Sequence, residues 1–174
     1  MKNSVQLSPV QEITMEVFKL LQVYWLFKRY SEKIVIEDRG GLDALEQRLL
    51  MRALYQDIIL RLCKIGDVGR DTWGLQQVAK YLKKHGSSRH IPANIDIKIA
   101  DYKKAIKELE DDQRNKYMAH LAKDKSNLVK PPPDFRGAIP LAVHICDELN
   151  GERVEYKIGS EWSGIEINLR ESFE

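Results

Sequence analysis

The 174-residue chain lacks long apolar runs and contains little cysteine. A transmembrane helix needs on the order of 18 consecutive apolar residues, and no such stretch occurs, so we expect no membrane partner. Cysteine occurs only at Cys63 and Cys146, which is too few for a four-cysteine zinc site or a disulfide framework. Residues 1–12 contain no apolar signal core, so we expect a cytoplasmic protein.

Sequence patterns typical of several catalytic and cofactor sites are also missing. No Gly-Lys-Ser or Gly-Lys-Thr follows an apolar strand, which excludes a Walker-type phosphate loop. His85 and His90 have no partners at metal-ligand spacing, and His144 with Cys146 lies in an apolar helical segment, where packing is the favoured interpretation. We therefore expect neither a metal nor a cofactor.

Positive charge is concentrated in the middle of the chain, although the net charge of the whole chain is only +2. Residues 75–130 carry 13 basic and 7 acidic side chains, whereas residues 131–174 carry 4 basic and 9 acidic ones. A basic middle indicates an anionic ligand such as nucleic acid. The alternative is that the basic and acidic segments attract each other or that both are simply solvated.

The spacing of apolar residues predicts helices over 10–29, 43–65, 75–84, 95–122 and 138–150. Ser8, Pro9 and Gln11 form a capping box at the first helix start. Asp57 and Arg61 have the i, i+4 spacing of a surface ion pair. We expect the segment 31–41 to form a loop.

Apolar residues alternate over 154–158 and again over 165–169, which predicts a small hairpin. The expected fold is therefore all-α, a bundle of four to five helices with a C-terminal β-hairpin. We expect a helical domain over 1–150 and a hairpin appendage over 151–174.

One motif late in the fourth predicted helix carries chemistry. Arg114 and Asn115 are followed by His120, with an alanine directly before the histidine. In this helical setting the motif resembles the signature of the HEPN superfamily (higher eukaryotes and prokaryotes nucleotide-binding). The resemblance spans roughly residues 10–150, which implies a HEPN-like bundle.

A second region is similar to the abortive-infection branch of that superfamily. It comprises the segment Leu54–Asp67, which contains Arg61-Leu62 and ends at Asp67, followed by Trp73-Gly74-Leu75. Many members of the superfamily are metal-independent endoribonucleases, and others are inactive relatives or partners of nucleotidyltransferases. The resemblance therefore implies a toxin or phage-defence ribonuclease, with a cognate antitoxin as a further partner.

By resemblance, Arg114 and His120 are catalytic and Asn115 supports them. The residue types suit the reaction, because histidine transfers protons near neutral pH and arginine offers a permanent bidentate charge to a phosphate. The alternatives are a packed helix-end His120 and an ion pair of Arg114 with Glu110 or Asp111.

Further RNA contacts are expected beside the motif, at Lys116, Tyr117, Lys123 and Lys125. Lys116 suits either a phosphate contact or a solvated charge. Tyr117 suits a core or interface position, or a stack on a base.

The spacing of the motif favours a homodimer. On one straight helix Arg114 and His120 lie about 9 Å apart along the axis and about 120° apart around it, so one phosphate does not reach both easily. Two motif copies facing each other across a two-fold axis would form one composite site. Three functions stay open: an endoribonuclease, a catalytically silent module that binds nucleic acid, a nucleotide or a partner protein, and an unrelated helical interaction protein.

Overall fold

The computed structural model describes residues 7–34, 41–69, 72–85, 91–110, 134–160 and 165–173. The elements are α1 (Pro9–Ile34), α2 (Gly41–Gly66), α3 (Leu75–Lys84), α4 (Ile95–Glu108), α5 (Ala138–Asn150), β1 (Lys157–Ser160), β2 (Ile165–Asn168) and a 3-10 turn, η4 (Leu169–Ser172). The predicted all-α bundle with a small C-terminal hairpin is confirmed.

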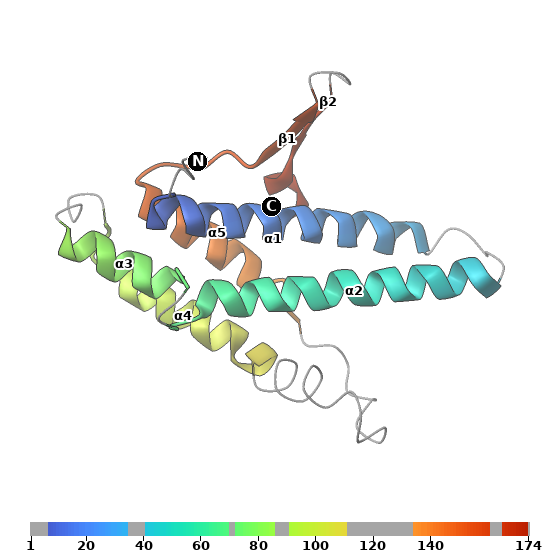
Figure 1. Ribbon diagram of the computed structural model, residues 1–174, viewed down its shortest axis with the longest axis horizontal. Helices are drawn as coiled ribbons and strands as arrows, with labels where there is room; N and C mark the ends of the chain where they lie inside the picture. The colour runs from blue at the N-terminus through green and yellow to red at the C-terminus, as the bar shows by residue number, and fades with distance from the viewer. Residues whose placement is uncertain are drawn as a thin grey trace, which may run out of the picture.

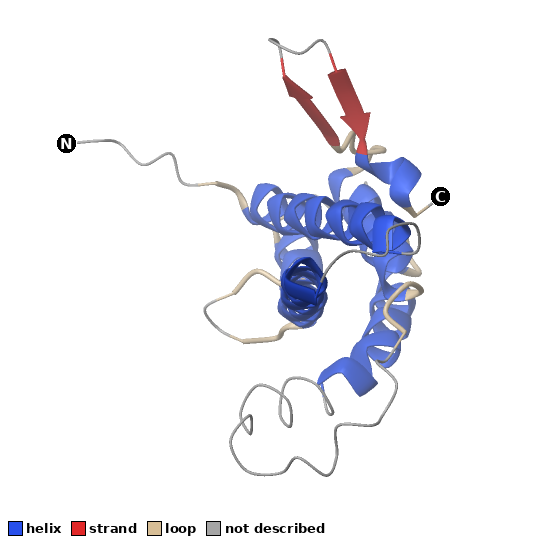
Figure 2. Cartoon of the chain, turned by 90° about the vertical axis from the view of Figure 1, so that its right-hand side faces the viewer, coloured by secondary structure: helices blue, strands red, loops and turns tan. Residues whose placement is uncertain are grey.

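The two long helices α1 and α2 run side by side and form the body of the molecule (Figure 1). Helix α5 packs against α1 and α4, and α3 lies beside α4 at one end of the bundle (Figure 1). The β-hairpin stands away from the helices in both Figure 1 and Figure 2. The bundle is therefore a helical hairpin completed by three shorter helices.

The core follows the apolar periodicity of the sequence. Ile13, Val17 and Leu20 recur along one face of α1 and are fully buried. Ile58 and Leu62 of α2 are buried in the same core. Each such side chain contributes roughly 1.5–3 kcal/mol by leaving water, so this core is the main source of stability.

The start of α1 is the predicted capping box. The Ser8 backbone N–H donates to Gln11 Oε1 at 2.9 Å, and the Gln11 N–H donates to Ser8 Oγ at 3.3 Å. The end of α1 differs from the prediction, because the helix continues past the expected end at residue 29 to Ile34, into the beginning of the expected loop. Ser31 is accommodated because its hydroxyl donates to the Lys28 carbonyl at 2.8 Å.

Helix α5 ends at the predicted Asn-Gly stop. Gly151 adopts φ 75°, a left-handed conformation that glycine tolerates without strain. The Gly151 N–H donates to the Glu148 carbonyl, and the Glu152 N–H donates to the Asp147 carbonyl, both at 3.2 Å. These hydrogen bonds satisfy backbone carbonyls that would otherwise have no donor at the end of the helix.

The hairpin is shorter than the alternating pattern. Ile158 pairs with Ile167 in an antiparallel register, but the first strand begins only at Lys157. Tyr156 lies just before it, buried and stacked on Phe18 of α1 at 6.4 Å between ring centroids. The Tyr156 carbonyl also accepts a hydrogen bond from the Leu169 N–H at 2.8 Å, so this residue both continues the pairing and joins the hairpin to the bundle.

Candidate functional site

All seven predicted site residues fall in the segment 111–133, outside the residues that the structure describes. These residues are Arg114, Asn115, Lys116, Tyr117, His120, Lys123 and Lys125. The structure does describe both ends between which this segment runs.

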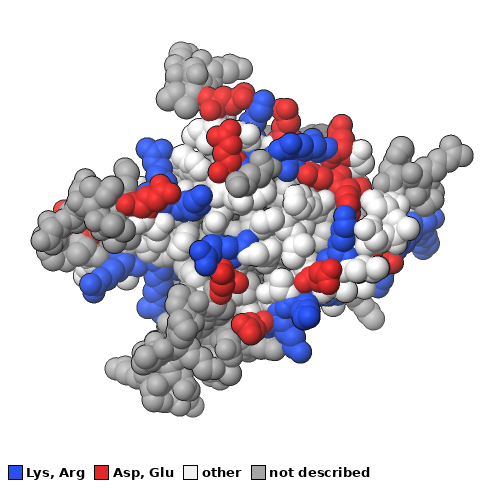
Figure 3. Space-filling view, turned by 180° about the vertical axis from the view of Figure 1, so that it is seen from behind, with Lys and Arg blue, Asp and Glu red and all other residues white. Residues whose placement is uncertain are grey.

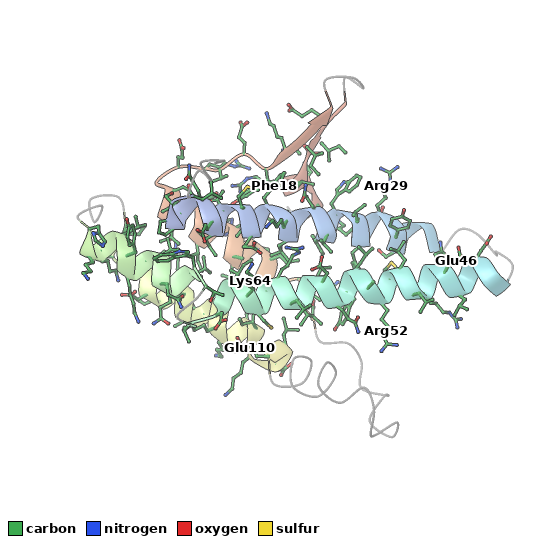
Figure 4. All side chains as sticks on the ribbon, viewed as in Figure 1. Phe18, Arg29, Glu46, Arg52, Lys64 and Glu110 are labelled. Carbon is green, nitrogen blue, oxygen red and sulfur yellow. The ribbon has the colours of Figure 1, made fainter. Side chains whose placement is uncertain are left out.

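The preceding end is α4, which is docked tightly against α2. Tyr102 is completely buried, and its hydroxyl donates to the Leu62 carbonyl at 2.8 Å. Burial raises the pKa of Tyr102, so the phenol stays protonated and keeps donating. A Cβ atom on Gly66 would collide with Ile106 Cδ1, which shows how closely the two helices approach. Glu110 marks the end of this described stretch (Figure 4).

The following end is anchored by an aromatic cluster. Phe135 is 5% exposed, and its ring lies 6.1 Å from Tyr24, 5.6 Å from Phe27 and 5.4 Å from Tyr55. The described chain therefore stops after the buried helix α4 and resumes beside a buried aromatic ring, and the motif lies between these two anchored points in the sequence.

Lysines of the basic middle are partly neutralised in the fold. Lys83 pairs with Asp96 at 2.6 Å, and Lys98 pairs with Glu148 of the acidic C-terminal part. Positive and negative side chains are interspersed around a broad uncharged area on the face shown in Figure 3. One contact thus joins the basic and acidic segments, as the alternative interpretation of the charge pattern expected.

An open pocket of about 490 Å³ lies where α5 meets the C-terminal segment. Its lining residues are Pro92, His144, Asp147, Glu148, Gly151, Glu152, Arg153 and Arg170. Arg170 Nη2 donates to both carboxylate oxygens of Asp147 at 2.6 and 2.7 Å, and its Nε donates to the Val154 carbonyl at 2.9 Å. This pair, of buried Arg170 and partly buried Asp147, ties η4 to α5, and we assign it a structural role.

The predicted packing of the His144 and Cys146 pair is only half right. Cys146 is buried, and burial raises the pKa of its thiol. Its Sγ lies 3.5 Å from Thr14 Oγ1 of α1. His144 instead is exposed and lines the pocket, because a step of two residues turns it away from the face that packs on α1.

Sequence reasoning missed a chain of three aromatic side chains, Trp73, Tyr81 and His85, which we call the aromatic ladder. Ring centroids are 5.6 Å apart between Trp73 and Tyr81, and 4.4 Å apart between Tyr81 and His85. Trp73 and Tyr81 are each 37% exposed. The i, i+4 spacing of Tyr81 and His85 was a visible signal, but Trp73 joins them only in the fold.

No group of three histidine, cysteine, aspartate or glutamate side chains in the described part of the chain could hold a metal ion. None of the described helices combines the length and apolar character that crossing a membrane requires. No protein-family model, no curated protein and no solved structure matches the chain.

Proposed function

We propose that this chain is a metal-independent endoribonuclease of toxin or phage-defence type, with Arg114, Asn115 and His120 as its catalytic residues. The observation that carries the proposal is the motif itself, in which His120 follows the Arg114-Asn115 pair by five residues. The all-α bundle supports it, because the resemblance to the HEPN superfamily implies this fold class.

The proposed reaction needs only groups that these residue types supply. The RNA 2′-hydroxyl oxygen attacks the adjacent phosphorus, and the bond from phosphorus to the 5′-oxygen breaks. His120 takes the proton from the 2′-hydroxyl and returns a proton to the departing 5′-oxygen. Arg114 neutralises the charge that develops on the phosphate oxygens, and Asn115 orients them. The products carry a 2′,3′-cyclic phosphate upstream and a 5′-hydroxyl downstream.

The test is incubation of mixed RNA with the full chain in the presence of a chelator. Arg114→Ala should slow cleavage about 10²–10³-fold, the usual cost of losing a preorganised charge at a transition state. His120→Ala should slow it about 10²–10⁴-fold. Asn115→Ala should cost less, because the amide carries no charge. DNA should stay intact, since it lacks the nucleophile.

His144→Ala is the matched control, because it removes an exposed histidine from α5 and should leave the rate unchanged. Full activity in both Arg114→Ala and His120→Ala would contradict the proposal. Binding of RNA without cleavage by the wild-type chain would instead place it with the catalytically silent relatives.

Phosphate contacts by Lys116, Lys123 and Lys125, with Tyr117 stacking on a base, belong to the same proposal. Their signature is steep weakening of RNA binding with salt, because each neutralised phosphate releases counterions.

A further inference from the structure

We propose that the aromatic ladder on α3, together with Lys80 and Lys84, is a docking platform for single-stranded RNA. The identity of the ligand as RNA rests on the proposed function. The platform itself rests on the described geometry of α3 and of the loop before it, outside the segment that carries the motif.

The ladder lies on a surface of α3 that is not its packing face. Helix α3 buries Leu75, Val78, Ala79 and Leu82 against the bundle. Tyr81 instead makes ring contacts with Trp73 at an interplanar angle of 75° and with His85 at 36°. Because Trp73 and Tyr81 keep more than a third of their surfaces in contact with water, they have area left for a base to stack on.

The loop before α3 holds Trp73 in place. The Asp67 carboxylate accepts hydrogen bonds from the Gly69 N–H at 2.9 Å and from Thr72 Oγ1 at 3.4 Å. Gln77 Nε2 donates to the Gly69 carbonyl at 2.7 Å. The hydrogen bonds of Thr72 and Gln77 therefore constrain the chain on either side of Trp73, which removes part of the entropic cost of binding.

Two lysines accompany the rings. Lys80 precedes Tyr81 and Lys84 follows it by three residues, so both project from the same two turns of α3. Within the described residues neither lysine has an ion-pair partner, and α3 itself contains no acidic residue. The nearby Lys83 is neutralised by Asp96, whereas Lys80 and Lys84 are cations of the described part of α3 that can contact phosphates.

This combination favours an unpaired strand over a duplex or a protein. Exposed rings can stack only on bases that are not already stacked in a duplex, and every base offers a π-face. Cations beside the rings match the repeating phosphates of such a strand. An acidic peptide would satisfy the lysines but would leave the rings without stacking partners.

The experiment measures binding of a fluorescent 2′-O-methyl oligouridine of about 12 nucleotides, a typical single-strand site size. Its blocked 2′-oxygens prevent cleavage by the proposed mechanism, so binding is read alone. Tyr81→Ala should weaken binding roughly 5- to 100-fold, the cost of one stacked base. Tyr81→Phe keeps the ring and should bind like the wild type.

The double variant Lys80→Gln with Lys84→Gln should bind the probe more weakly. The slope of log affinity against log salt concentration should become shallower by about 1.4, because two phosphate contacts are lost. Lys157→Gln on the β-hairpin is the matched control and should bind unchanged. Circular dichroism should show that every variant is folded.

Wild-type affinity in folded Tyr81→Ala would overturn the platform, and so would preference for an acidic peptide or for duplex RNA over the single-stranded probe. If Tyr81→Ala binds like the wild type and RNA is still cleaved, the platform is wrong and the proposed endoribonuclease is retained. If binding depends on Tyr81 but the chain cleaves no RNA, the platform is retained and the endoribonuclease is wrong.

Discussion

Glu16 shows how single residues join the two long helices. Its carboxylate lies 2.9 Å from Lys19 Nζ on α1 and 3.1 Å from Lys64 Nζ, which reaches across from α2. Arg61 of α2 comes within 3.6 Å of the same carboxylate and also forms the predicted pair with Asp57, at 3.1 Å. The surface ion pair expected from spacing is therefore one part of a larger group of charges between the helices.

The Glu16 cluster predicts a pH dependence of stability. Burial raises the pKa of Glu16, but hydrogen bonds from Lys19 and Lys64 outweigh burial and hold it below its ordinary value of 4.5. The ionised group therefore stabilises the fold above that value, and the contribution disappears as the pH falls through the lowered pKa. We expect Glu16→Gln to reduce the free energy of unfolding by about 0.5–1 kcal/mol at pH 7, since water partly screens the cluster.

Urea denaturation at neutral pH and at about pH 3 measures this effect, and the two proteins should converge at the lower pH. Glu12→Gln on the same helix is the control. An equal loss at both pH values would show that Glu16 acts by packing and not by its charge.

At the scale of elements, the loop between α2 and α3 depends on a close backbone approach. A Cβ atom at Gly74 would collide with the Asp67 carbonyl oxygen and crowd the Gln77 side chain. The first obstacle is backbone and cannot move aside cheaply. Gly74 therefore allows α3 to start where it does and sets the position of Trp73 beside it.

Gly74→Ala should accordingly destabilise the protein by about 1–3 kcal/mol, the usual cost of forcing atoms into a packed site. Thermal denaturation followed by circular dichroism provides the measurement. Gly137→Ala is matched to it, because Gly137 is also the residue before a helix but its added Cβ would meet nothing within 4 Å. The control should change stability by less than about 0.5 kcal/mol, and equal losses in the two variants would contradict this account.

At the scale of the whole molecule, α2 leaves a set of apolar side chains uncovered. Leu45 is 53% exposed and Leu49 is 57% exposed, and Leu50 and Leu60 are also exposed on this helix. A composite site built from two copies of the motif requires a second chain. We therefore propose these leucines as the surface on which the second copy packs.

Light scattering of the wild type should then give a molecular mass twice that of one chain. The double variant Leu45→Glu with Leu49→Glu should give the mass of a single chain. The composite-site model then predicts that cleavage falls with the dimer, because that model needs the motif of a second chain. Ile97→Glu is the control, since Ile97 is a 65% exposed apolar residue on α4. A monomeric wild type at high concentration would remove the composite-site model.

The helices that end at local signals were predictable to the residue. The predicted ranges 75–84 and 138–150 match α3 and α5, and the capping box at Ser8 is present. Apolar periodicity, caps and Asn-Gly stops act within one or two helical turns, so residues close together in the sequence are enough to predict them. The motif from Arg114 to His120 is readable in the same local way, and it stays a prediction.

Contacts between distant residues followed from no such pattern. Arg170 of η4 meets Asp147 of α5, and Trp73 of the loop before α3 meets Tyr81. Helix α1 likewise continues to Ile34, into the segment 31–41 that we expected to be a loop. Each of these features depends on which surfaces come together once the helices pack, and that packing energy is shared among many side chains, so no single stretch of sequence encodes it.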